Sequence, residues 1–103
     1  LKYVMMANHG GDHTIYPDCR PEFVNAMSET TKTGTFLGIE ILAPYTSITK
    51  ADIARRGKKL GIDYSKTWSC YKGGVHHCGK CGTCVERIEA LRDAGIHDDT
   101  VYE

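Results

Sequence analysis

The order of secondary-structure elements predicts an α/β protein with a parallel sheet and a metal-binding region at its C-terminal end. Strand-like and helix-like segments alternate along the first sixty residues, and four cysteines crowd into residues 70–84. Strands that alternate with helices are typical of parallel sheets. Because two strands alone make a poor sheet, we expect the remaining strands to lie upstream of this chain.

The first strand is predicted at residues 3–7, where the apolar run YVMM has no alternation. Such a run fits a strand buried on both faces, as in a parallel sheet, and a short buried helix is the alternative. The chain opens on this run without an initiator methionine, so we expect it to be a piece of a longer protein. A polar loop is expected at residues 9–20.

A helix is predicted from about residue 21 to residue 32. Pro21 suits a first helical position, Phe23 and Met27 follow at helical spacing, and Gly34 is expected to end the helix. The second strand is predicted at residues 36–42, where Leu, Ile and Ile alternate with Gly and Glu.

Thr49 and Asp52 form a capping-box-like start for a second helix. We expect its apolar face to consist of Ile53, Gly57 and Leu60. The opposite face carries Arg55, Arg56, Lys58 and Lys59. Four cations on one face suit a phosphate or a nucleic acid, although such a face is more often simply solvated.

A second capping box, Thr83 to Glu86, predicts the last helix, with Gly95 closing it. Cys84 then lies in the first turn, where the helix N-terminus favours a thiolate. The polar tail, residues 97–103, is expected to fray.

The cysteine cluster is the main candidate site. Cys78, Cys81 and Cys84 form two overlapping C-x-x-C units, and Cys70 lies eight residues before Cys78. Four thiolates close a tetrahedral Zn²⁺ site with no open position, the pattern of a structural zinc. The alternatives are disulfide or redox chemistry, which the shared Cys81 makes awkward, and an iron–sulfur cluster, whose spacing fits less well.

Several neighbours have two interpretations. His76 and His77 precede Cys78 and either could replace a cysteine ligand, but we expect exposed loop residues. Lys72, Lys80 and Arg87 could offset the charge of four thiolates or be ordinary solvated cations. Trp68, beside the metal loop, is expected to be a packing anchor.

Composition limits the function. The 103 residues suffice for one domain with a modest core, and thirteen basic residues balance thirteen acidic ones. A dedicated nucleic-acid binder usually has a basic excess. No run of eighteen apolar residues occurs, so no membrane span is expected. Free cysteines without a secretory signal indicate a reducing, cytoplasmic location.

Four segments together resemble the 7-cyano-7-deazaguanine synthase family, and the resemblance extends over nearly the whole chain, from residue 3 to residue 95. In combination they are far more specific than the zinc spacing alone. They are residues 16–23 (the family's YPDC-x-PEF), residues 44–61 (Pro-x5-Lys-Ala-Asp-Ile, then Leu-Gly), residues 67–71 (TWSCY) and residues 78–84 (CG-x-C-x2-C).

The resemblance implies an adenine-nucleotide-hydrolase-like, Rossmann-like α/β sandwich that forms homodimers. It implies an ATP-dependent ligase of queuosine biosynthesis, which converts 7-carboxy-7-deazaguanine and ammonia through an amide to a nitrile. Residues 1–66 would belong to the α/β domain and residues 67–103 to the zinc-binding region. One Zn²⁺ per chain would be held by Cys70, Cys78, Cys81 and Cys84, with ATP and Mg²⁺ bound by the full-length enzyme.

The chain departs from the family at the nucleotide site. The family's Ser-Gly-Gly-x-Asp-Ser loop presents backbone N–H groups to phosphate. This sequence has only Gly10-Gly11-Asp12, which we expect to be a substrate-side loop. The chain alone is therefore expected to bind ATP poorly and to be inactive.

Three other residues are candidates for binding substrate or phosphate, and each has an ordinary alternative. Lys50 could approach phosphates or be a first-turn lysine. Arg20 could bind a carboxylate, and Asp18 could act beside it or merely shape a turn. Cys19 is expected to be a buried thiol rather than a nucleophile. The alternative functions are a small zinc module that contacts nucleic acid or protein, and a structural fragment that associates through open sheet edges.

Overall fold

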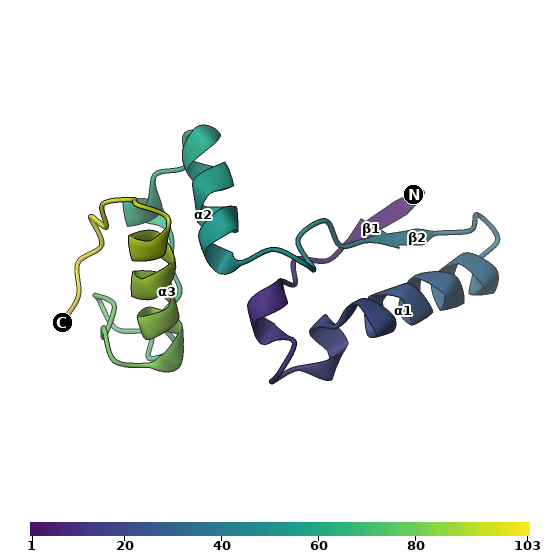
Figure 1. The fold of residues 1–103 in the computed structure, drawn as a ribbon, viewed down its shortest axis with the longest axis horizontal. Coiled ribbons are helices and arrows are strands. Elements are labelled where there is room, and N and C mark those ends of the chain that lie inside the picture. The colour runs from purple at the N-terminus through teal and green to yellow at the C-terminus, as the bar shows by residue number, and fades with distance from the viewer. The chain divides into compact units, whose positions relative to one another are not determined.

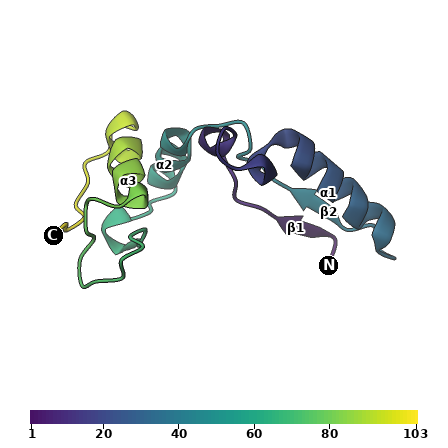
Figure 2. The same ribbon diagram turned by 90° about the horizontal axis from the view of Figure 1, so that it is seen from below.

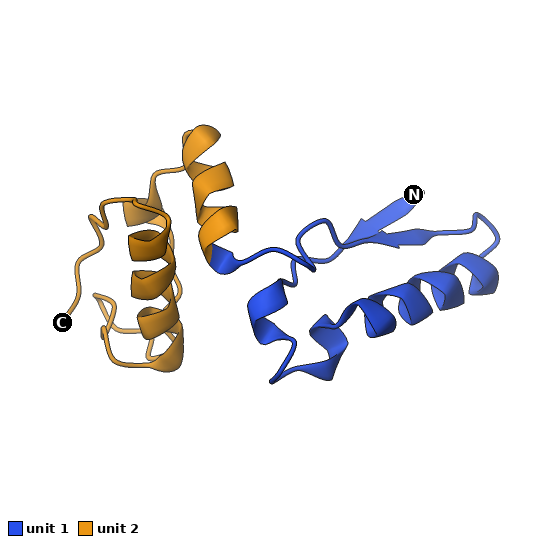
Figure 3. Cartoon of the chain, viewed as in Figure 1, with its two compact units in different colours: residues 1–50 blue, residues 51–103 orange.

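A computed structural model describes all 103 residues and divides the chain into two compact units, Leu1–Lys50 and Ala51–Glu103 (Figure 3). The main elements follow in the order β1, α1, β2, α2 and α3 (Figure 1), which confirms the predicted alternation. None of the helices combines the length and the apolar character that a membrane span requires.

The first unit is a short parallel sheet with one helix packed along it (Figures 1 and 2). Strand β1 (Tyr3–Met5) pairs in parallel with β2 (Glu40–Leu42), with Val4 opposite Ile41. Helix α1 (Pro21–Gly34) connects them and begins at Pro21, as predicted. Two helix hydroxyls hold it to β2: Ser28 accepts from the Ile41 amide at 3.0 Å and Thr31 donates to the Ile39 carbonyl at 2.8 Å.

Two strand predictions are wrong in detail. The expected burial of the first strand on both faces is not observed, because Tyr3, Val4 and Met5 are 44%, 43% and 72% exposed. A single neighbouring strand and a single helix leave the other face and edge of β1 open. The second strand begins at Glu40 rather than at residue 36. The preceding residues form a turn after α1 in which Gly38 has φ +62° and its amide donates to the Thr35 carbonyl.

The second unit is built from α2 (Lys50–Lys59), α3 (Gly82–Asp93) and the loops between and after them. Helix α2 begins directly after Thr49, as the capping box predicts, but its buried residues are Ala54 and Gly57. The expected apolar contact of Leu60 is wrong, because this side chain is 80% exposed. It lies just past the last turn of α2, where the backbone turns at Gly61 (φ +80°).

Gly57 is required by packing. Its missing side chain makes room for the Tyr64 phenol, which donates to the Ala54 carbonyl at 2.8 Å. Arg55, on the cationic face of α2, is not merely solvated: it pairs with Asp52 and donates to the Asp93 carbonyl at the end of α3, both at 2.7 Å. The Arg55–Asp93 contact joins α2 to the end of α3.

The expected fraying of the C-terminal tail is also wrong. After α3 the chain turns at Gly95 and runs back along the helix (Figures 1 and 2). Tyr102 forms a parallel bridge with His77, and the Glu103 amide donates to the His77 carbonyl at 2.8 Å. The tail is therefore part of the fold.

Candidate metal centre

The four clustered cysteines converge on one point of the second unit. The Sγ atoms of Cys70, Cys78, Cys81 and Cys84 all lie within 4.8 Å of one another. All four thiols are free; Cys70, Cys78 and Cys84 are buried and Cys81 is partly buried. This clustering is the one expected from the spacing of the cysteines.

The turn from Cys78 to Cys81 wraps its backbone around one sulfur. The amides of Lys80 and Cys81 donate to Cys78 Sγ at 3.4 and 3.3 Å. Gly79 makes this turn possible with φ +66°, in the left-handed region that favours glycine. Backbone donors of this kind stabilise a thiolate and orient it.

Cys70 and Cys84 both lie next to Cys78. The Cys78 amide donates to Cys70 Sγ at 3.4 Å, and Cys78 Sγ lies 4.0 Å from Cys84 Sγ. Cys84 is in the first turn of α3, as predicted. The predicted capping box is displaced, however: α3 begins at Gly82 with Cys81 as its N-cap. The Thr83 hydroxyl therefore lies inside the helix, 3.3 Å from Cys81 Sγ.

The thiols of the cluster differ strongly in acidity. The Thr83 hydroxyl, helped by the amides of Tyr71 and Cys84, lowers the pKa of Cys81 to about 5. Burial, together with the Cys81 contact, raises the pKa of Cys84 to about 12. The Cys78 amide lowers the pKa of Cys70 despite its burial. Four crowded thiols resist ionising together, so a dication that binds them must displace protons.

The donor set fits one zinc ion. Four sulfurs at about 2.3 Å from Zn²⁺ in a tetrahedron lie about 3.8 Å apart, and the Cys78–Cys84 separation of 4.0 Å is close to this. Sulfurs this near to one another suit a single ion better than an iron–sulfur cluster, whose cysteines must span several metal atoms. A closed set of four thiols leaves no position for a substrate.

The two histidines beside Cys78 behave differently. His76 is exposed, as expected, but the expectation is wrong for His77, which is 4% exposed. The His77 imidazole accepts from the Ser69 amide at 3.3 Å and its ring centroid lies 4.3 Å from that of Trp68. Burial, with the nearby Arg87 cation, lowers the pKa of His77. Its partners are thus an amide and an aromatic ring rather than the metal-site sulfurs.

Trp68 and Arg87 brace the site from outside the sulfur cluster. The Trp68 indole donates to the Cys70 carbonyl at 2.8 Å, although the side chain is 51% exposed and is not the buried packing anchor that was expected. The Arg87 guanidinium donates to the Thr67 hydroxyl at 2.9 Å, to the Thr100 hydroxyl and to the Tyr64 carbonyl. These direct partners are neutral oxygens, while Lys72 and Lys80 are exposed.

The candidates for binding substrate lie away from the cysteines in sequence. Asp18 is exposed in a short 3-10 turn, and Arg20, also exposed, donates to the His13 carbonyl at 2.7 Å. Lys50 is partly buried at the first position of α2. Cys19 is only partly buried, which differs from the expected buried thiol. Desolvation, with the carboxylates of Asp18 and Asp12, raises the pKa of Cys19, which suits an inert thiol better than a nucleophile.

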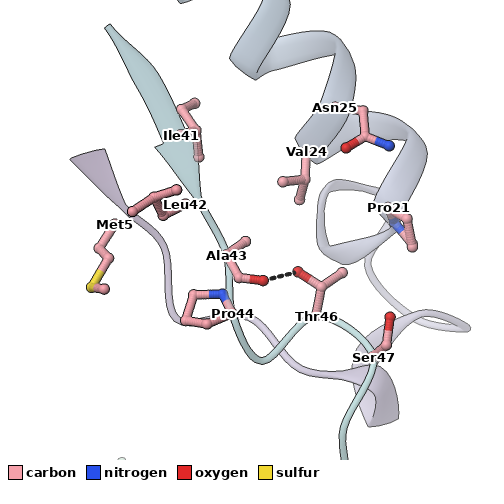
Figure 4. A pocket seen from close by; sticks show the side chains of 10 residues that line it. All are labelled: Met5, Pro21, Val24, Asn25, Ile41, Leu42, Ala43, Pro44, Thr46 and Ser47. Atoms are coloured by element: carbon pink, nitrogen blue, oxygen red, sulfur yellow. Dashed lines mark hydrogen bonds between the residues drawn. The ribbon is translucent and has the colours of Figure 1, made fainter. Parts of the chain in front are cut away.

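The first unit also contains a pocket of about 390 Å³ that sequence reasoning missed. It lies at the carboxyl ends of β1 and β2, where open α/β sheets bind ligands. In Figure 4, Val24 and Asn25 project from α1, and Thr46 and Ser47 belong to the loop after β2. The rule that ligands bind at the carboxyl ends of parallel strands could have directed attention to this loop.

A buried polar contact lies behind the pocket. Asn8 is 6% exposed, and its amide donates to the Cys19 carbonyl at 3.0 Å. Its Oδ1 lies 3.4 Å from the Thr46 hydroxyl, whose shorter hydrogen bond, at 2.8 Å, goes to the Ala43 carbonyl (Figure 4). Asn8 follows β1 and Thr46 follows β2, so this residue ties the loop bearing Asp18 and Arg20 to both strand ends. The sequence alone offers no signal for this contact.

Comparison with known proteins places these features in a family context. The model of the family described as queuosine biosynthesis protein QueC matches residues 1–95. A 7-cyano-7-deazaguanine synthase from Porphyromonas gingivalis (strain ATCC 33277) is 65% identical over 103 residues, which are 100% of this chain and 47% of that protein. A protein of the same name from Caldicellulosiruptor bescii is 53% identical over 102 residues, 99% of this chain and 46% of the relative.

The similarity extends to an archaeal protein. The 7-cyano-7-deazaguanine synthase of Methanoregula boonei is 50% identical over 101 residues, 98% of this chain and 46% of that protein. The chain thus spans a little under half the length of these relatives. No solved structure matches the chain.

Proposed function

The chain belongs to the family of the queuosine biosynthesis protein QueC, and we propose on this premise that it is the C-terminal part of a 7-cyano-7-deazaguanine synthase. The whole enzyme would be an ATP-dependent ligase that converts 7-carboxy-7-deazaguanine and ammonia to 7-cyano-7-deazaguanine. One observation carries the proposal: the family match covers residues 1–95, and relatives of that name are similar over the whole chain.

The proposed reaction explains the need for ATP. A carboxylate does not accept ammonia directly, so ATP must first transfer a phosphoryl or adenylyl group to one carboxylate oxygen, with ADP or pyrophosphate as the leaving group. Attack by ammonia on this activated acyl group forms an amide and releases that oxygen with its phosphorus group. A second activation removes the amide oxygen in the same way, and loss of the remaining amide protons leaves the nitrile.

The first unit offers groups for holding the substrate. The pocket at the ends of β1 and β2 combines apolar walls with the Asn25 amide and the Thr46 hydroxyl, a lining that suits a planar heterocycle. Arg20, on the loop that Asn8 ties to the strand ends, would bind the carboxylate, with Asp18 beside it. Lys50 would approach the phosphates of ATP.

The second unit would hold one structural Zn²⁺ through Cys70, Cys78, Cys81 and Cys84. When bound, the ion supplies a rigid crosslink between the loop and α3, because a closed set of four thiolates leaves no coordination site for catalysis. We also propose the division into an α/β domain, residues 1–66, and a zinc region, residues 67–103. The α/β part would complete a Rossmann-like, adenine-nucleotide-hydrolase-like sandwich with strands from the rest of the enzyme.

The remaining assignments follow from the same family. The nucleotide loop and bound Mg²⁺ would be contributed outside this chain, since Gly10–Asp12 forms a short 3-10 turn rather than opening an α-helix. The enzyme would act in the cytoplasm as a homodimer, without direct contact to nucleic acid. The isolated chain would be inactive.

The test is an assay of the full-length enzyme with 7-carboxy-7-deazaguanine, ATP, Mg²⁺ and ammonium, with the product identified by mass spectrometry. We expect the nitrile to form only when all components are present, and metal analysis to give one zinc per chain. Arg20→Gln should raise KM for the acid, whereas Lys32→Gln, whose lysine pairs on the surface with Glu40, should not. ATP consumption with another carboxylic acid alone would contradict the substrate assignment.

A further inference from the structure

The last six residues of the chain are docked on the metal-binding loop of the second unit. The His77 amide donates to the Val101 carbonyl at 3.3 Å, and the Glu103 amide donates back to the His77 carbonyl at 2.8 Å. This short parallel pairing lies directly before Cys78. Residues 98–103 also lie beyond the stretch that the family model matches, which ends at residue 95.

Tyr102 covers the turn that wraps Cys78. A Cβ added to Gly79 would meet the Tyr102 side chain at 3.5 Å, an ordinary van der Waals distance, so the ring faces this turn. The Tyr102 ring also meets the His77 imidazole edge-on, with centroids 5.8 Å apart. The amides that donate to Cys78 Sγ belong to the same turn, so Tyr102 restrains the backbone that shapes the metal site.

Asp98 gives the docked segment its conformation. Its carboxylate accepts from the Thr100 amide at 3.0 Å and from the Tyr102 phenol. The carboxylate therefore closes a loop within the segment and holds the Tyr102 phenol in place. The adjacent Asp99 does none of this: its carboxylate is 71% exposed and pairs only with His97, which is 88% exposed.

Arg87 anchors the same segment to helix α3. Its guanidinium donates to the Thr100 hydroxyl through Nε at 3.2 Å and through Nη2 at 2.9 Å. The same side chain holds Thr67 and Tyr64 on the loop that leads to Cys70. Arg87 is one turn beyond Cys84 on α3, so a single cation links the tail, the loop before the first cysteine and the helix of the last cysteine.

We propose that residues 98–103 form a clasp that retains the metal ion. A metal held by four thiolates leaves only when one ligand segment swings away, and the turn from Cys78 to Cys81 is the segment that the clasp covers. Asp98, Thr100 and Tyr102 act as positioning residues toward the metal site, with Arg87 as their anchor. The clasp slows metal release without contributing a ligand, in the way that outer-sphere partners tune metal affinity.

The test compares two neighbouring substitutions with the same change in charge, Asp98→Ala and Asp99→Ala, in the full chain loaded with Zn²⁺. Transfer of Zn²⁺ to an excess of a colour-forming chelator is followed with time. We expect roughly 10- to 100-fold faster release from Asp98→Ala, and an unchanged rate from Asp99→Ala. Tyr102→Phe should accelerate release by a smaller factor, because the ring stays and only the phenol contact is lost.

Global unfolding of each zinc-loaded variant is measured in parallel by circular dichroism. The clasp predicts that Asp98→Ala releases zinc faster than it unfolds, because only the tail and the turn need to open. If release accelerates only in step with global unfolding, or if Asp98→Ala and Asp99→Ala release zinc at equal rates, the proposal is wrong. A chain ended after His97 should release zinc fastest; should it fail to fold, the two point variants decide the matter.

Discussion

The two small units of the chain are stabilised by different kinds of contact. The first unit buries only one apolar side chain, Val24, and leaves the strand residues of β1 exposed. The second unit buries three cysteines together with Ala54, Ala90 and Leu91, and surrounds them with side-chain hydrogen bonds. About fifty residues cannot build a large apolar core, and a metal ion held by the four cysteines would take over part of that role in the second unit.

This difference indicates which contacts stabilise each unit. The first unit has the form of a sheet segment whose open face and edges suit additional strands. The second unit depends on its metal ligands and on a few long-range contacts, such as those of Arg87 and Tyr102. Removing the metal should therefore destabilise the second unit and leave the first unit folded. Truncating a buried apolar side chain should lower the free energy of unfolding more in the second unit than in the first.

The largest effect is expected from removal of a metal ligand. Cys84→Ser should weaken zinc binding by more than roughly 100-fold, because it removes a ligand rather than an outer partner. Hydrogen exchange should then become fast throughout Ala51–Glu103, while the amides that join β1 and β2 keep their protection. Cys19→Ser is the matched control and should retain zinc. Equal loss of protection in Leu1–Lys50 would show that the first unit also depends on the metal.

A pair of core truncations tests the apolar part of the comparison. Leu91→Ala, in the second unit, should lower the free energy of unfolding by about 2–5 kcal/mol, since the side chain is 3% exposed. Val24→Ala, in the first unit, removes less buried surface and should cost about 1–2 kcal/mol. Chemical denaturation, monitored by hydrogen exchange in each unit, measures both changes in the free energy of unfolding. If Val24→Ala lowered the free energy of unfolding more than Leu91→Ala, the expectation that the second unit depends more on its apolar core would be wrong.

The buried polar contact of the first unit provides a third test. Asn8→Ala leaves the Cys19 carbonyl without its donor and should cost about 1–3 kcal/mol. Asn25→Ala, on the exposed part of α1, is the control and should change the free energy of unfolding by less than about 0.5 kcal/mol. If the two variants have the same free energy of unfolding, Asn8 does not hold the loop to the strand ends.

The smallest effect concerns pH. Burial, with the Asp98 carboxylate, raises the pKa of Tyr102 from 10.0 to about 12. The folded state thus prefers the neutral phenol, and this stabilisation is complete below pH 10 and is lost as the pH rises from 10 to 12. The ultraviolet difference titration of the wild type minus Tyr102→Phe should show one phenol with a midpoint near pH 12. A midpoint near 10 would mean that the tail is not docked in solution.

Local sequence signals predicted the parts of this molecule that depend on neighbours in the chain. Pro21 and the Thr49–Asp52 box mark the starts of α1 and α2 because helix starts depend on the first few residues. Periodicity failed at residues 36–39 and at Leu60. The alternating pattern starts before β2 begins, and the helical pattern continues past the last residue of α2. Only the glycine turns at Gly38 and Gly61 reveal these two boundaries.

The cysteine spacing by itself determined the candidate metal centre, because C-x-x-C turns bring sulfurs together through local backbone geometry. The segments that carry the family resemblance could also be recognised from the sequence alone. Only the tertiary structure decided that His77 is buried, that Asn8 meets Thr46 and that the polar tail is ordered against the metal loop. These contacts join residues 25 to 38 positions apart, and their stability comes from partners that no local pattern of polar residues identifies.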